Sequence, residues 1–252
     1  MLSNLTSILS SIDSLKSRLY KVRPLDSTQL KKINEAIFIE YTYDSNRIEG
    51  NTLTLQETAL IVQKGITISG KNLTEHLEAI NHYEAVEYIQ KIVADKIELS
   101  DRILKDIHAL VLRSIDTDNA GKYRNVNVKI AGSRFMPADS VKVIDEMENY
   151  FKWYSENKDK LHPVILSAEM HERLVTIHPF IDGNGRTARL VMNLVLLQNG
   201  FTIANIIGSN ENRLKYYNAL EKCQVENICE DFHVLVAETV ENSLHEYLKI
   251  AE

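Results

Sequence analysis

The residues of this chain that could do chemistry are concentrated in one segment, 178–189, with the sequence HPFIDGNGRTAR. It combines a base, an acid, two glycines and two arginines. Glycines let a backbone turn so that successive N–H groups point at one anion, and Gly183 and Gly185 flank Asn184 here. The segment therefore predicts a loop that binds phosphate.

A helix is expected to follow the glycines directly. Apolar residues recur on a helical period from about Arg186 onward, and Asn199-Gly200 is a typical C-terminal cap. The loop would thus lie at a helix N-terminus, where unpaired amides and the helix dipole favour phosphate. Arg186 and Arg189 would share a face of the first turns and oppose that dipole unless an anion meets them. The plain structural alternative is a glycine turn between two core helices, with both arginines solvated.

His178 and Asp182 have the residue types for two further tasks. A base that removes a proton from an attacking hydroxyl should titrate near neutrality, which histidine does. A carboxylate beside a phosphate loop would repel its ligand unless a divalent cation lay between them, so Asp182 implies Mg²⁺. Phosphoryl or nucleotidyl transfer needs this combination of charge neutralisation and a prepared nucleophile. Taken singly, either residue could simply cap a helix.

Helices must position this segment, because almost the whole chain has helical patterning. We expect helices at about 3–20, 27–48, 54–64, 73–95, 100–114, 140–157, 163–177, 185–198, 211–224 and 230–250. The exception is 121–137, where alternating apolar residues precede a glycine turn and predict a short β-hairpin. The predicted fold class is therefore all-α with one short β-hairpin.

The composition excludes several functional classes. The 252 residues carry a net charge of −6 without a block of basic residues, which argues against binding to nucleic acid or to a membrane surface. We expect neither a signal peptide nor a membrane span. Cys223 and Cys229 are too few for a disulfide scaffold, so a reducing cytoplasm is the expected location.

The segment 178–189 resembles the signature of Fic proteins, HxFx(D/E)GNGRxxR, at every fixed position. The likeness extends to Gly121-Lys122-Tyr123-Arg124 and to 213–220, and it covers about residues 30–225. Membership of that family would imply a helical bundle that transfers AMP from ATP to a Ser, Thr or Tyr hydroxyl of a target protein or of itself, with release of pyrophosphate. The chain would then comprise an N-terminal helical region, 1–95, and a catalytic core, 96–252, in one compact unit.

The resemblance also implies roles for the residues of the phosphate loop. His178 is similar to the family's base, which deprotonates the target hydroxyl, and Asp182 is similar to its Mg²⁺ ligand. Asn184, with the amides of Gly183 and Gly185, resembles the hole that surrounds the α- and β-phosphates of ATP.

Further roles are implied for residues around that loop. Arg186 resembles the partner of the β-phosphate, and Arg189 resembles the arginine that faces the γ-phosphate. Tyr216 and Tyr217 lie where the family contacts adenosine, although two tyrosines on a helix are otherwise ordinary core residues. The hairpin resembles a flap that adds the target segment as a strand. The flap residues expected to contact the target are Val128, Lys129 and Ile130.

A second acidic motif lies upstream, at the end of the helix expected at 27–48. Gly50 is a good C-terminal cap, so Glu49 would stand on the last turn, where a carboxylate opposes the helix dipole unless a cation meets it. Ser45 and Glu49 match the family's inhibitory motif, (S/T)xxxE(G/N). The resemblance implies that Glu49 pairs with Arg189 and intrudes on the place of the γ-phosphate, so that an inhibitory helix, about 27–49, restrains the enzyme. On the six-residue pattern alone, a solvated helix end is the alternative.

Several other functions stay open on the sequence. A sister branch transfers phosphate, but it carries a lysine where this chain has Gly185. Transfer of another nucleotide, or removal of AMP with the help of Glu49, would use the same site. A non-catalytic nucleotide-binding module or DNA-binding regulator is a different class, against which the intact His178 and the lack of a basic recognition helix argue. The sequence identifies no target, and the terminal helices could pack on the core or form a homodimer.

Overall fold

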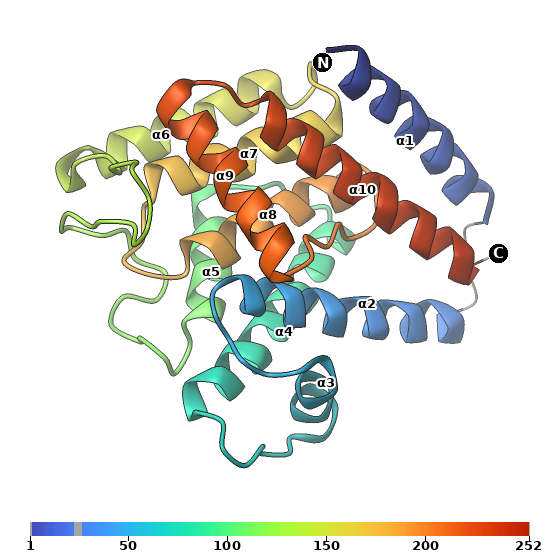
Figure 1. Cartoon of the computed structure of the whole chain (residues 1–252), viewed down its shortest axis with the longest axis horizontal. Coiled ribbons are helices and arrows are strands. Elements are labelled where there is room, and N and C mark those ends of the chain that lie inside the picture. Colours follow the sequence, from blue (N-terminus) through green and yellow to red (C-terminus); the bar gives the residue numbers. More distant parts are fainter. Residues whose placement is uncertain (1, 23–26, 252) are drawn as a thin grey trace.

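The computed structural model describes residues 2–22 and 27–251, which fold into a helical bundle (Figure 1). The elements in these ranges are α1 (Leu2–Val22), α2 (Ser27–Ile48), α3 (Leu55–Lys64), α4 (Leu73–Ala94), α5 (Asp101–Val111), the short 3₁₀ helix η1 (Ser140–Lys142), α6 (Val143–Asn157), α7 (Pro163–Ile177), α8 (Asn184–Gln198), α9 (Asn210–Glu226) and α10 (Glu230–Ala251). The prediction of a predominantly helical fold is confirmed.

Helix α8, which follows the glycine loop, is the centre of the bundle. Most of its side chains are buried, and these include Arg186, Arg189 and Asn193 as well as the apolar residues of its second half. It packs against α7 on one side and against α4 and α5 on the other. The phosphate loop is therefore held by the most enclosed helix of the described chain.

Two other pairs of helices enclose this centre. Helix α1 lies along α10, and α2 packs on α4 and touches α8 (Figure 1). One apolar core runs through the bundle and includes residues from both sides of the boundary predicted near residue 95. The C-terminal end of α2 thereby comes to lie beside the start of α8.

The helix predicted at 100–114 ends earlier than expected, at Val111. Leu112 caps the helix, and Ser114 has a φ of 61°, a left-handed conformation that an α-helix cannot continue. The following residues form turns as far as Gly121.

The β-hairpin predicted at 121–137 is wrong, because the structure forms no strand within its described ranges. The expected turn is present: Gly132 has a φ of 79°, and the N–H of Ser133 donates to the carbonyl of Ile130. The two arms beside this turn do not pair with each other. We refer to residues 125–139 as the flap loop.

Side chains bind backbone groups of both arms where cross-strand hydrogen bonds were expected. Arg124 donates to the carbonyls of Val126 and Ala138. On the far side of the turn, Glu221 of α9 accepts the N–H of Arg134 at 2.7 Å. The segment with the alternating apolar pattern is therefore a loop whose backbone groups bind neighbouring side chains, and its arms do not form a ladder of cross-strand hydrogen bonds.

Cys223, near the end of α9, and Cys229, just before α10, form a disulfide. The sequence analysis did not predict this pairing. Disulfides are uncommon in a reducing cytoplasm, so the pair gives no support to the expected location, which stays a prediction. Within the described ranges, every helix is too short or too polar to cross a membrane.

Candidate active site

The loop 178–183 joins α7 to α8 through two left-handed residues. His178 caps α7 with a φ of 52°, and its N–H donates to the carbonyl of Leu174 at 2.9 Å. Gly183 begins α8 with a φ of 75°, a conformation that glycine adopts without strain. These two turns direct the chain back on itself and bring His178 beside the N-terminus of α8.

The inside of this loop is braced by Asn184 and Phe180. The side-chain oxygen of Asn184 accepts the N–H of Phe180 at 3.0 Å, and its side-chain nitrogen donates to the carbonyl of the same residue at 2.9 Å. Phe180 is fully buried and stacks on the ring of His108, with centroids 3.6 Å apart. Because its side chain is used within the loop, Asn184 would contact an anion through its backbone N–H.

His108 of α5 binds the backbone of the loop 178–183. Its Nδ1 accepts the N–H of Gly121 at 2.9 Å, so its Nε2 carries the proton and donates to the carbonyl of Asp182 at 2.9 Å. Burial lowers the pKa of His108 to about 4, so the ring is neutral at physiological pH. A Cβ at Gly183 would make only ordinary van der Waals contact with this ring, so the glycine is required by its positive φ and not by lack of space.

Arg124 ties the loop to both arms of the flap loop. The buried guanidinium donates to the carbonyl of His178 at 2.8 Å and to those of Val126 and Ala138 at 2.9 and 2.5 Å. Its backbone N–H donates to the carbonyl of Pro179 at 2.9 Å. One side chain therefore sets the position of the flap loop relative to the predicted base.

The ring of His178 is oriented by its own helix. Its Nδ1 lies 3.3 Å from the carbonyl of Val175, which can only accept, so Nδ1 carries the proton and Nε2 is left as an acceptor. Burial lowers the pKa of His178, while the Val175 carbonyl and the carboxylates of Glu49 and Asp182 oppose that shift. A neutral imidazole with a free Nε2 is the form that a general base requires.

Arg186 is held between two carboxylates. It donates to Glu78 of α4 at 2.9 Å and to Asp182 at 3.3 Å. Glu78 also accepts a hydrogen bond from Asn51 at 2.9 Å, so it links the phosphate loop to the residues that follow α2. The Asp182 side chain is 64% exposed, unlike that of Arg186, which is 4% exposed. Asp182 is therefore free to take a cation while Arg186 is fixed in place.

Arg189 binds the C-terminal end of α2, the helix that the sequence analysis predicts to be inhibitory. Its fully buried guanidinium donates to Glu49 Oε1 at 2.7 Å, to Ser45 Oγ at 3.0 Å and to the carbonyl of Ser45 at 2.8 Å. Burial alone would lower the pKa of Arg189, but Glu49 and Tyr216 raise it above its ordinary value. A Cβ at Gly185 would collide with Glu49 Oε1, so this glycine gives the carboxylate access to the arginine.

Two tyrosines of α9 lie beside Arg189 and the end of α2. The hydroxyl of Tyr216 accepts from Arg189 at 3.3 Å and lies 3.0 Å from Nε2 of the buried His171. The hydroxyl of Tyr217 donates to the carbonyl of Ile48 at 2.9 Å. Tyr216 is buried and Tyr217 is 41% exposed. Tyr217 therefore binds the end of α2 directly, whereas Tyr216 acts on α2 only through Arg189.

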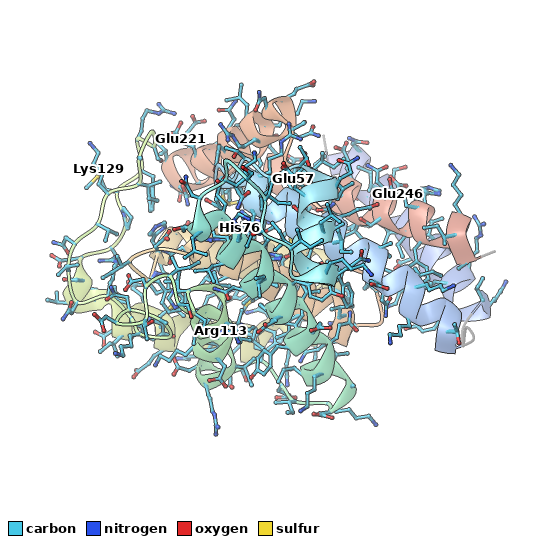
Figure 2. All side chains as sticks on the ribbon, turned by 90° about the horizontal axis from the view of Figure 1, so that it is seen from below. Glu57, His76, Arg113, Lys129, Glu221 and Glu246 are labelled. Atoms are coloured by element: carbon cyan, nitrogen blue, oxygen red, sulfur yellow. A yellow bond between two sulfur atoms is a disulfide. The ribbon has the colours of Figure 1, made fainter. Side chains whose placement is uncertain are left out.

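These groups surround one cavity of about 570 Å³. The flap loop and α9 close it at an edge of the molecule where Lys129 and Glu221 lie near each other (Figure 2). The lining residues that the sequence analysis predicted are Glu49, Lys129, Ile130, His178, Asp182, Gly183, Asn184, Gly185, Arg186, Tyr216 and Tyr217. Val128, Ser45 and Arg189 do not line it, and Arg189 is buried behind Glu49. The roles of all these residues toward a ligand stay predictions.

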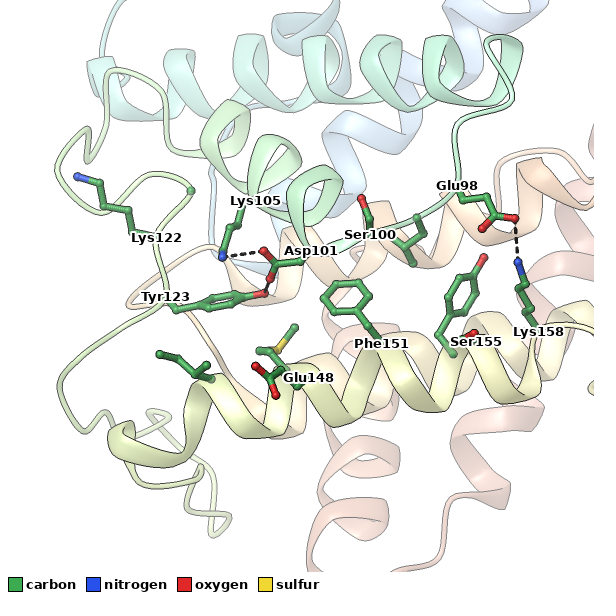
Figure 3. Close-up of a pocket in the computed structure, with 15 residues that line it drawn as sticks. Glu98, Ser100, Asp101, Lys105, Lys122, Tyr123, Glu148, Phe151, Ser155 and Lys158 are labelled. Atoms are coloured by element: carbon green, nitrogen blue, oxygen red, sulfur yellow. Dashed lines mark hydrogen bonds and ion pairs between the residues drawn. The ribbon is translucent and has the colours of Figure 1, made fainter.

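A larger cavity, of about 880 Å³, lies elsewhere, between α6 and the first turns of α5 (Figure 3). Tyr123 donates to Asp101 there at 2.6 Å, and Lys158 pairs with Glu98 at 2.8 Å. The residues 178–189 do not line it. Its size therefore says nothing of the chemistry, which we place in the smaller cavity.

The sequence of the chain resembles characterised proteins along most of its length. The Fic/DOC family profile matches residues 98–196. "Protein adenylyltransferase Fic" from Drosophila persimilis is 33% identical over 241 residues, which make up 95% of this chain and 46% of that protein. The protein of the same name from Drosophila melanogaster is 32% identical, with 95% of this chain and 48% of that protein covered. The chain thus spans about half the length of the curated relatives it matches.

Solved structures agree over a larger share of both chains. Fic-1 (residues 134–508) from C. elegans has a TM-score of 0.86 and 30% identity, and the match covers 97% of this chain and 72% of that one. A Fic domain containing signaling protein from Bacteroides thetaiotaomicron has a TM-score of 0.86 and 31% identity, with 96% of each chain covered. The chain belongs to the Fic/DOC family. The Fic-type helical fold expected from the sequence is thereby confirmed, whereas its flap is a loop.

Three residues that support the Fic motif were missed by the sequence analysis. His108 carried a signal, because a histidine on the apolar face of an amphipathic helix must find polar partners when it is buried. Arg124 was noted only as part of a resemblance, and nothing in its neighbours predicts contacts with four carbonyls. Glu78 carried no signal, because its partner Arg186 is 108 residues away in sequence.

Proposed function

We propose that this chain is a protein adenylyltransferase that transfers AMP from ATP to a hydroxyl of a target protein or of itself, and that Glu49 restrains it. The observation that carries the proposal is that His178, the glycine loop and Glu49 line one cavity, with Arg189 paired to Glu49 behind it. The name of the Drosophila relatives supports the same chemistry.

In the proposed reaction the amides at the start of α8 and Arg186 bind the phosphates of ATP. His178 Nε2 takes the proton of the target hydroxyl, whose oxygen then attacks the α-phosphorus. The bond from the α-phosphorus to the bridging oxygen breaks, and pyrophosphate leaves. Fixed donors of this kind stabilise charge as it develops in the transition state.

Asp182 is the residue that we propose as the Mg²⁺ ligand. Its exposed carboxylate lines the cavity, and Mg²⁺ is usually held by one or two carboxylates together with substrate phosphates. A single carboxylate beside a phosphate loop fits that donor set. When bound, the ion would neutralise phosphate charge, while the protein groups position the reactants.

The target is proposed to be a protein whose chain lies along the flap loop, where Lys129 and Ile130 line the cavity. IbpAFic2, which resembles this chain in fold alone at 13% identity and a TM-score of 0.55, has been solved tethered to Cdc42. We also retain as proposals a division into residues 1–95 and 96–252, a cytoplasmic location, and no role for nucleic acid.

Intact mass spectrometry tests this function directly. The Glu49→Gly variant is incubated with ATP and Mg²⁺, beside the parent chain and the double variant Glu49→Gly/His178→Ala. We expect addition of AMP to the first protein, much less to the parent, and none to the double variant. A mass increase equal to phosphate would instead indicate the phosphotransferase branch, and no increase with ATP, UTP or GTP would leave a nucleotide-binding module.

A further inference from the structure

Helix α2 is held to the catalytic core on a second flank, away from Arg189. Asp44 lies about 140° around the helix from Glu49, since each residue turns an α-helix by about 100°. It is 7% exposed and faces the segment 201–208, between α8 and α9. Asp44 Oδ1 accepts the N–H of Gly208 at 2.8 Å, and its Oδ2 accepts the side-chain nitrogen of Asn205 at 2.7 Å.

The segment that binds Asp44 is itself fixed to the core. Asn193 of α8 donates to the carbonyl of Ala204 at 3.1 Å and accepts its N–H at 2.7 Å. Ser243 of α10 accepts the N–H of Asn205 at 3.3 Å. Asp44 therefore connects the inhibitory helix to α8, the helix that also carries Arg189.

Gly208 is required for this contact. A Cβ at this position would lie 2.7 Å from the carbonyl oxygen of Asp44 and 3.0 Å from Cβ of Arg47. Helix α2 and the segment 201–208 are thus as close as their backbones allow. Such a close approach aligns the N–H of Gly208 with the carboxylate of Asp44.

The contact lies beside solvent, in a groove of about 760 Å³ between α2, α9 and α10 that Asp44, Arg47 and Asn205 line. If the two hydrogen bonds break, water in this groove can satisfy the freed groups. Opening therefore avoids the large cost of an unpaired buried carboxylate. The two hydrogen bonds of Asp44 can therefore hold α2 in place, and breaking them costs little free energy because water replaces them.

We propose that Asp44, Asn205 and Gly208 form a latch that keeps α2 in its inhibitory position, and that opening the latch activates transfer while Glu49 and Arg189 remain unchanged in sequence. The inference rests on the proposed function, because it names the regulation of the same site. Asp44 is a positioning residue, since it touches none of the groups that line the phosphate loop. Its effect on the site passes through the placement of α2.

Removal of the Asp44 carboxylate is the first test. Asp44→Ala should raise AMP transfer by roughly tenfold over the parent, because it deletes two hydrogen bonds to a charged acceptor. Glu40→Ala is the matched control, since Glu40 is an exposed acid one turn earlier on α2; its charge repels that of Asp44, so its removal should not open the latch. Asp44→Ala added to Glu49→Gly should give no more transfer than Glu49→Gly alone, because α2 no longer inhibits in that background.

An exchange of the two partners distinguishes a latch from a general defect in folding. Asn205→Asp places two carboxylates against each other and should activate as Asp44→Ala does. Asp44→Asn combined with Asn205→Asp restores one amide and one carboxylate, with an oxygen still available to the N–H of Gly208. The double variant should return to the low transfer of the parent. A merely structural role would instead lower transfer and melting temperature in each variant.

Hydrogen exchange of the amides in residues 40–48 provides a readout that does not depend on transfer. Asp44→Ala and Asn205→Asp should speed this exchange, while Glu40→Ala and the double exchange variant should not. Unchanged exchange in Asp44→Ala overturns the latch. Absence of transfer in Glu49→Gly overturns the proposed function instead, and the latch is then judged on the exchange alone. Faster exchange without a rise in transfer, in a chain whose Glu49→Gly variant is active, also overturns the latch.

Discussion

Glu49 and Arg189 form an ion pair of 2.7 Å in which the arginine is fully buried and the carboxylate is 31% exposed. Solvent can therefore reach the carboxylate of Glu49 but not the guanidinium of Arg189. If Glu49 leaves, the guanidinium loses the one carboxylate that pairs with it among the described residues and requires another anion, because a buried unpaired charge is strongly unfavourable. On the proposed function, displacement of α2 and binding of a phosphate at Arg189 are therefore expected to depend on each other.

Glu49→Gln should activate less than Glu49→Gly. The amide oxygen of glutamine can still accept from Arg189, but a hydrogen bond without charge on the acceptor is about half as strong. We expect transfer between that of the parent and that of Glu49→Gly, measured with labelled ATP. Ser45→Ala, which removes only the bond from Arg189 Nε, should raise transfer less than either. Equal transfer by the parent and Glu49→Gln would mean that the charge of Glu49 does not matter.

Tyr217→Phe should raise transfer by up to about fivefold and should not raise the KM for ATP. It removes one hydrogen bond to the carbonyl of Ile48, worth about 1 kcal/mol, and keeps the ring at the proposed adenosine position. Tyr88→Phe is the control, because its hydroxyl bonds to Asp106, away from α2. A higher KM without a rise in kcat would assign the hydroxyl to ATP binding and not to the hold on α2.

Arg124→Lys should abolish most of the transfer seen in Glu49→Gly while the chain still folds. A lysine ammonium cannot reach the four carbonyls that the planar guanidinium contacts, so the flap loop and His178 lose their common anchor. We expect a loss of at least about tenfold in kcat and a lower melting temperature. Lys122→Arg, two residues earlier and exposed, is the control. Full activity of Arg124→Lys would show that the flap loop needs no such anchor.

How much of this site the sequence could predict depends on how far apart the interacting residues lie. The order HPFIDGNGR places its loop at a helix start through local rules, and the positive φ of Gly183 bears this out. Glu78, which pairs with Arg186, and Glu49, which pairs with Arg189, lie 108 and 140 residues away from them in sequence. The second of these pairs was expected only because a family resemblance supplied it.

The flap illustrates the opposite case, in which a local rule failed. Alternating apolar residues with a glycine turn are typical of a hairpin. The pattern does not show, however, which side chains from elsewhere will bind the N–H and C=O groups that the two arms would use to pair with each other. Arg124 and Glu221 compete successfully here, and both lie outside the two arms. Cys223 and Cys229, six residues apart, lie on either side of the break between α9 and α10, and the sequence analysis did not predict that they pair.

Asp182→Asn in the Glu49→Gly background should increase the Mg²⁺ concentration that half-maximal transfer requires. An amide oxygen is a weaker ligand for Mg²⁺ than a carboxylate, while the loop keeps its shape because His108 binds the backbone carbonyl of Asp182 and not its side chain. A Mg²⁺ titration at fixed ATP measures the shift. Asp139→Asn, in the flap loop, is the control. An unchanged titration curve would remove Asp182 from the proposed metal site.

Acid should destabilise the chain through His108, whose pKa is lowered to about 4 by burial. Its ordinary value is about 6.5, so between these values the unfolded chain binds a proton that the folded chain does not. The free energy of unfolding should therefore fall as the pH drops from about 6.5 to about 4, by up to about 3 kcal/mol from this residue. The direction follows from linkage: stability decreases with falling pH wherever the unfolded state binds more protons.

His108→Gln isolates this contribution, because glutamine retains a donor toward Asp182 but does not titrate. The variant should be less stable than the parent at pH 7, and its stability should decline less steeply between pH 6.5 and 4. Urea unfolding at several pH values measures both effects. His82 and His171 are also buried with a lowered pKa, so some decline should persist in the variant. A slope identical to that of the parent would show that His108 does not couple protonation to folding, and that the phosphate loop does not depend on its neutral form.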